Sequence, residues 1–145
     1  MEKTIFKLKK IFLIILSLYI MVFFNSCTKQ IMNEYYSQKS NYVNASGIVA
    51  HISYNDDKSA LYLGFSDLNP RFDDDSFKIV GDNLLIAQNN GVDKKIRIGD
   101  RVDFITAPRY FGDGYVFPIV GLSINNDKLL NFEDGFYNLL KWLDD

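Results

Sequence analysis

The chain has 145 residues, a formal net charge of −2 at neutral pH and 48% hydrophobic residues. This composition excludes an extended disordered chain and fits one folded domain of ordinary size, because so apolar a chain can bury enough surface to offset its ordering entropy. The first ten residues contain four lysines and one glutamate, so the rest carries 12 basic and 17 acidic residues. An acidic body repels phosphate backbones, and no nucleic-acid partner is expected.

The first 27 residues have the layout of an export signal. Four lysines precede an uncharged apolar run over residues 11–24, and Ser26 and Cys27 follow. A bilayer-spanning helix needs about 20 apolar residues, so this run is short for one. A basic start, a short apolar run and a small residue are typical of a secretory signal. A short transmembrane anchor and a buried core helix remain the alternatives.

The end of this segment, FNSC at residues 24–27, resembles the lipobox of bacterial lipoproteins, with Phe24 where leucine is usual. The resemblance implies that residues 1–26 are removed and that Cys27 receives a diacylglyceryl group with palmitate-like chains. Two acyl chains anchor a protein stably at about 0.8 kcal/mol per buried CH₂. The Ser–Cys ending is similar to that of Bacteroidota lipoproteins. Thr28 follows the cysteine, where the resemblance would place Asp in an inner-membrane retention signal. This implies attachment to the outer membrane facing the periplasm, or to the outer face of the cell membrane where there is only one membrane.

Beyond the cysteine, residues 28–42 are polar and aperiodic, which predicts a flexible tether over residues 27–42 and a single domain over residues 43–145. Period-two alternation and turn residues then predict a series of short strands. In the first strand, Ile48, Ala50, Ile52 and Tyr54 share one face, and Val49, His51 and Ser53 share the other. The expected strands cover residues 47–54, 60–65, 77–80, 84–87, 95–98, 102–106, 115–124 and 128–130. In the second of these, Leu61, Leu63 and Phe65 are expected to face inward. Residues 115–124 are apolar on both faces, which predicts a central or doubly covered strand with a bend or bulge at Pro118.

The final segment predicts a helix over residues 132–143. Five apolar residues recur at helical spacing, and Asn131 is suited to the N-cap. They are Phe132, Phe136, Leu139, Leu140 and Leu143. Short strands followed by one helix indicate a mainly β fold, a small antiparallel barrel or meander with a C-terminal amphipathic helix. The stretch IRIGDRVDF at residues 96–104 resembles OB-like and SH3-like barrels.

Few residues are suited to catalysis or to metal binding. One histidine, His51, and one cysteine, Cys27, are too few for a catalytic triad or a transition-metal site. Residues 73–75 are consecutive aspartates that, with Asp67 and Asn69, offer oxygen ligands, but they lack a regular calcium-loop spacing. No cofactor, metal or catalytic residue is expected. A hydrolase that uses two carboxylates stays open as an alternative.

The richest candidate for a partner-binding surface is residues 108–118, PRYFGDGYVFP. Its tyrosines and arginine are residue types that dominate binding hot spots. The expected contact residues are Arg109, Tyr110, Phe111 and Tyr115. Alternatively, these aromatics cover the mouth of the barrel as part of its core. The sequence therefore favours a lipid-anchored envelope protein that binds a protein or glycan partner, or supports the envelope, without catalysis. An inhibitor or immunity lipoprotein against a secreted toxin or lytic enzyme is the first alternative.

Overall fold

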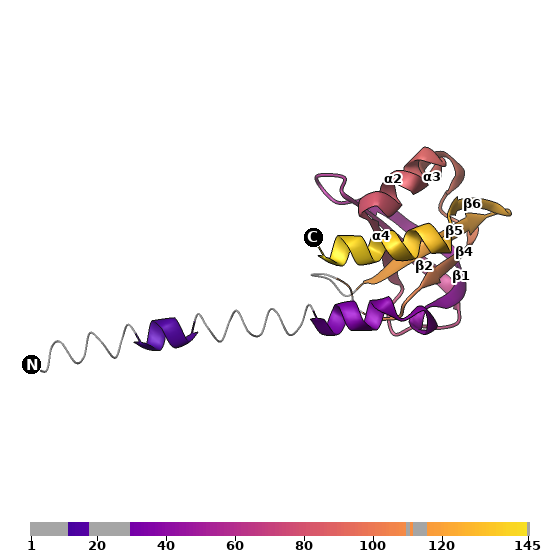
Figure 1. The fold of residues 1–145 in the computed structure, drawn as a ribbon. Coiled ribbons are helices and arrows are strands. Elements are labelled where there is room, and N and C mark those ends of the chain that lie inside the picture. Colours follow the sequence, from indigo (N-terminus) through magenta and orange to yellow (C-terminus); the bar gives the residue numbers. More distant parts are fainter. Residues whose placement is uncertain (1–11, 18–29, 110, 112–115, 145) are drawn as a thin grey trace, which may run out of the picture. The chain divides into compact units, whose positions relative to one another are not determined.

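The computed structural model describes residues 12–17, 30–109, 111 and 116–144 (Figure 1). The chain divides into two compact units, Met1–Tyr35 and Tyr36–Asp145. In the first unit, residues 12–17 and 30–35 are helical. Within the described ranges, no helix has both the length and the apolar character needed to cross a bilayer. Cys27 and most of the predicted signal lie outside the described residues.

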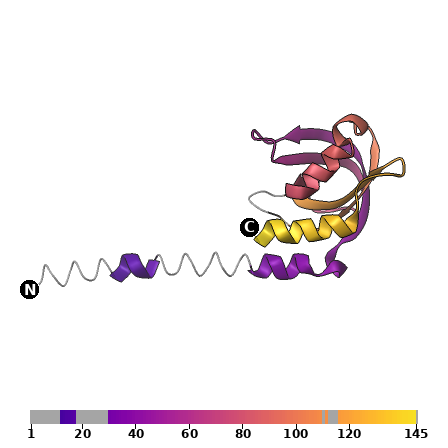
Figure 2. The same ribbon diagram turned by 45° about the horizontal axis from the view of Figure 1, so that its top comes forward.

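The second unit is built on one curved sheet (Figure 2). Its strands are β1 (Val43–Tyr54), β2 (Ala60–Asn69), β3 (Ser76–Val80), β4 (Arg101–Thr106), β5 (Phe117–Ile124) and β6 (Asp127–Leu130). The strand order is β3-β2-β1-β4-β5-β6, and β3 also pairs with β5. That parallel pairing closes five strands into a ring, while the other pairs are antiparallel. The small β barrel with a C-terminal helix predicted from the sequence is confirmed.

In the described part of this unit, the sheet is accompanied by η1 (Lys39–Asn41), α2 (Gly81–Asn89), α3 (Val92–Lys95) and α4 (Phe132–Asp144). The strands predicted at residues 84–87 and 95–98 are wrong, because those segments lie in α2 and at the end of α3. In α2 the buried Leu84 and Ala87 are three residues apart and share one helix face, whereas Leu85 is exposed. A four-residue apolar run has no period that distinguishes a strand from a helix.

The interior of the barrel is dominated by phenylalanines. The rings of Phe65 and Phe104 stack at 4.6 Å, and Phe77 meets both rings edge-on at 5.4 and 4.9 Å. Leu61 and Leu63 are buried beside them, as the alternation of β2 predicts. Aromatic pairs of this geometry contribute about 0.5–1.5 kcal/mol beyond the area that they bury.

The predicted facing of β1 is correct only in its second half. Val49, at 1% exposure, lies in the core, whereas Ile48 is half-buried and Ala50 is exposed. The register with β2 shifts between Val49 and His51, which is a β-bulge that reverses the inward face. Beyond the bulge, Ile52 and Tyr54 pack against the core as expected.

Strand β5 is covered on both faces, as its sequence predicts. Every residue of β5 except Ser123 is buried, and α4 packs on the outer side of the strand. The approach is so close that a Cβ on Gly135 would lie 1.8 Å from the carbonyl oxygen of Val120. The irregularity expected at Pro118 lies beyond it, where the register with β4 shifts between Ile119 and Gly121.

The folded unit begins at Tyr36, earlier than the predicted boundary at residue 43. The Tyr36 side chain is fully buried, and its hydroxyl donates to the carbonyl oxygen of Arg109 at 2.7 Å. The Tyr42 hydroxyl donates in turn to the carbonyl oxygen of Tyr36 at 2.8 Å. The last part of the segment predicted as a tether therefore belongs to the fold.

Candidate functional site

The loop predicted to bind a partner is mainly part of the interior where it is described. Phe111 is fully buried and meets Tyr36 edge-on at 5.8 Å and Trp142 at 4.9 Å. Arg109 is exposed, but its carbonyl oxygen holds Tyr36. Tyr110 and Tyr115 lie outside the described residues. Phe111 therefore behaves as the alternative interpretation expects, by covering the mouth of the barrel.

A buried cation explains part of that packing. Lys78 is 8% exposed, and its Nζ lies 4.7 Å from the ring centre of Phe111 and 5.9 Å from that of Trp142. An ammonium over aromatic faces is attracted by their quadrupoles, by about 2 kcal/mol when water is excluded. Lys78 thus connects β3 with Phe111 and with α4, which is a structural role.

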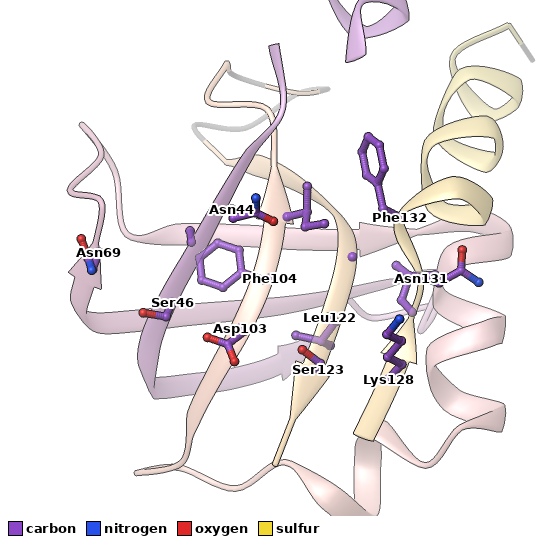
Figure 3. Close-up of a pocket in the computed structure, with 14 residues that line it drawn as sticks. Asn44, Ser46, Asn69, Asp103, Phe104, Leu122, Ser123, Lys128, Asn131 and Phe132 are labelled. Atoms are coloured by element: carbon purple, nitrogen blue, oxygen red, sulfur yellow. The ribbon is translucent and has the colours of Figure 1, made fainter. Parts of the chain in front are cut away.

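A polar hollow lies on the outer face of β1, β4, β5 and β6, next to the start of α4 (Figure 3). Its volume is about 510 Å³, within the range of small-molecule sites. No motif in the sequence marks this hollow, because its lining residues come from different strands.

Five polar side chains cross this hollow in a single line, which we call the polar row. In the sheet register, Ser46 of β1 is paired with Asn69 of β2 and with Asp103 of β4. Asp103 is paired with Ser123 of β5, and Ser123 with Lys128 of β6. Directly paired residues project from the same face of a sheet, so the row runs across five strands, as Figure 3 shows. Its members are Asn69, Ser46, Asp103, Ser123 and Lys128.

The side chains of the polar row have no polar partner among the described residues. Across the described residues, none of its five side chains makes a hydrogen bond or an ion pair with another side chain or with the backbone, and neither does the neighbouring Asn44. By contrast, the buried Asn83 donates to the carbonyl oxygen of Gly135 at 2.8 Å, and Asn90 donates to that of Leu129 at 3.0 Å. The row therefore presents both donors and acceptors to a ligand.

An apolar strip borders the polar row. Asn44 is paired with Ile105, and Ile105 with Gly121, two residues along each strand from the row. A Cβ on Gly121 would lie 3.0 Å from Ile105, so the glycine leaves space for the isoleucine side chain to lie across β5. The half-buried Phe132 and the N-cap Asn131 line the α4 side of the hollow.

The other candidate groups are not assembled into a reactive site. His51 is exposed, beside a smaller hollow of about 370 Å³ that also contains Asp75 and Ser76. No acidic side chain in the described ranges is buried, and the same ranges contain no cluster of three metal-ligating residues. Asp73, Asp74 and Asp75 lie in the loop before β3, where the Asp74 carboxylate accepts from the backbone of the next two residues.

The resolved pKa shifts have local causes outside the polar row. Burial, and then the hydrogen bond to Asp93, raise the pKa of Tyr54. The hydrogen bond to Glu133 raises the pKa of Lys39, and the hydroxyl and N–H of Ser59 lower the pKa of Asp57. These shifts mark surface and turn contacts.

A second hollow of about 490 Å³ lies at the end of the barrel near α3. Its lining is mainly aliphatic, including Ile52 and the exposed Ile98, with Asp93 and Arg97 at the rim. Arg97 already donates to the carbonyl oxygen of Asp93 at 2.9 Å. This hollow therefore has fewer polar groups to orient a ligand than the polar row has.

Comparisons with protein-family models, curated protein sequences and solved structures found no match.

Proposed function

We propose that this protein is a lipid-anchored envelope protein with an OB-like barrel that binds its ligand, without catalysis, along the polar row. The observation that carries the binding proposal is the row itself, five aligned polar side chains with no hydrogen bond or ion pair among the described residues, in a hollow of about 510 Å³. Side chains that have no partner in the fold are available to a ligand at little cost in internal hydrogen bonding.

The OB-like assignment is supported by the path of the chain. Strands β1, β2 and β3 follow one another, and the chain then passes through α2 and α3 before β4 pairs with β1. The spatial order β4-β1-β2-β3 is that of a Greek key. A five-stranded Greek-key barrel is the OB architecture, which makes the OB-like alternative preferable to the SH3-like one.

The anchoring proposal depends on the N-terminal sequence. A basic start and a short apolar run lead to the single Cys27, which we infer carries the lipid after residues 1–26 are removed. Mass spectrometry of the protein isolated from membranes tests this inference. We expect an N-terminal fragment that begins at an acylated Cys27. A membrane-bound chain that still begins at residue 1 would contradict it.

The two alternatives receive less support from the described residues. An inhibitor that uses a protruding 109–111 loop needs an exposed Phe111, which is instead buried. A hydrolase needs a carboxylic acid in a desolvated cleft, and every acidic side chain in the described ranges is exposed or half-buried.

Obstruction of the polar row tests the binding proposal. Ser123→Tyr places a ring in the hollow, whereas Ser66→Tyr places the same ring on an exposed position of β2 outside it. Each intact variant, in detergent, is incubated with native envelope material and the retained components are compared. We expect Ser66→Tyr to retain what the unmodified protein retains and Ser123→Tyr to lose a component. Equal retention by all three proteins would contradict the proposal.

A further inference from the structure

The geometry of the polar row indicates the shape of its ligand. Neighbouring strands lie about 4.8 Å apart, so a row that crosses five strands is about 19 Å long and offers one polar side chain per strand spacing. A ligand that uses the whole row is therefore an extended chain that lies across the strands, with a polar group at each step.

The chemistry of the row indicates an uncharged ligand. Three of its five members, Asn69, Ser46 and Ser123, are neutral groups that both donate and accept hydrogen bonds. Asp103 supplies one negative charge at the centre, and Lys128 supplies one positive charge at the end. A polynucleotide needs several cations along its phosphates, and this row has one.

The position of the row disfavours a peptide ligand. Peptides that bind sheets usually add as a strand at an open edge, parallel to the existing strands. The polar row lies instead on the face of the sheet, and β1, β4 and β5 at its centre are already paired on both sides. Side chains on one face of an extended peptide also recur at about 6.7 Å, which does not match the strand spacing.

A glycan fits both the spacing and the mixed polarity. A pyranose ring linked through equatorial positions advances its chain by close to one strand spacing and presents hydroxyl groups at its edges. The apolar strip of Ile105 over Gly121, next to Asp103 and Ser123, suits the C–H surface of such a ring. Figure 3 shows the polar row and Phe132 around the same hollow.

We propose, on the basis of the function proposed above, that the polar row binds an extended, uncharged, equatorially linked glycan that runs from Asn69 to Lys128. Asp103 accepts hydrogen bonds from its hydroxyl groups at the centre of the row. The site is centred on β1, β4 and β5, apart from the β2–β3 face on which OB-type barrels bind oligonucleotides and oligosaccharides.

Calorimetric titration of the intact chain in detergent tests this proposal. The probes are chitohexaose and cellohexaose, which are extended and uncharged, together with maltohexaose, which is curved, and a single-stranded oligonucleotide. We expect saturable binding of at least one extended probe and weaker binding of maltohexaose and the oligonucleotide. Asp103→Ala should weaken that binding about 10- to 100-fold, which is the effect of one hydrogen bond to a charged group.

Asp56→Ala is the matched control, because Asp56 is also an exposed aspartate but lies in the β1–β2 turn. It should bind the extended probe as the unmodified protein does. The glycan proposal is overturned if neither extended probe binds, or if Asp103→Ala binds the probe unchanged. If Ser123→Tyr still loses its envelope component in that case, the binding site stands and only the class of ligand is wrong.

Discussion

Gly135 is the residue at which α4 comes closest to the barrel. In an isolated helix, replacement of glycine by alanine stabilises by up to about 1 kcal/mol. Here the added Cβ would lie 1.8 Å from the carbonyl oxygen of Val120, so the helix and β5 must move apart. We expect Gly135→Ala to destabilise the fold by about 1–3 kcal/mol, measured by denaturant unfolding. A stabilised variant would show that α4 does not pack on β5 as described.

Lys78 stabilises the mouth of the barrel by its charge as well as by its length. Its ammonium lies over the rings of Phe111 and Trp142, and methionine has a similar length without the charge. Lys78→Met should lower the free energy of unfolding by about 0.5–2 kcal/mol. Lys94→Met, on the exposed side of α3, is the control and should change it little. Equal stability of both variants would exclude a cation–π contribution from Lys78.

At the scale of elements, Asn83 joins the two longer helices. Its amide donates to the carbonyl oxygen of Gly135 at 2.8 Å and accepts from Asn138 at 3.0 Å, although Asn83 is only 2% exposed. Asn83→Ala removes the hydrogen-bond partner of the buried Gly135 carbonyl and of the half-buried Asn138 amide. We therefore expect the free energy of unfolding to fall by about 1–3 kcal/mol, measured by thermal or chemical unfolding. The control is Asn89→Ala, at the exposed end of the same helix. Equal free energies of unfolding for the two variants would show that the hydrogen bonds of Asn83 do not stabilise the fold.

The sequence predicts the elements well where they are long or strictly alternating. Helix α4 and the inward residues of β2 are correct, because Phe136 and Leu139, or Leu61 and Leu63, follow a clear period. The misassigned strands are four-residue runs whose structure depends on tertiary packing. The facing of Ile48 and Ala50 is wrong because a bulge in β1 shifts the period by one residue, and the local sequence has no mark of it.

At the scale of the whole molecule, the binding surface depends on the sheet register. Ser46, Asp103 and Ser123 are each recognisable as polar positions in alternating strands. The sequence does not say that they are paired, and a slip of one residue would place them on the other face. The aromatic loop at residues 108–118 was conspicuous by composition, yet Phe111 and Phe117 fill the interior. Composition alone does not separate a binding aromatic from a core aromatic.

The central claim is that the polar row is occupied by a ligand in the envelope. Carbodiimide labelling of carboxyl groups, read by mass spectrometry, tests it on the native protein. Asp103 and Asp56 are both exposed, and neither makes an ion pair with a described residue. We expect Asp103 to be labelled several-fold less in intact envelopes than in the purified protein, with Asp56 labelled equally in both. Equal labelling of Asp103 in the two preparations would contradict the claim.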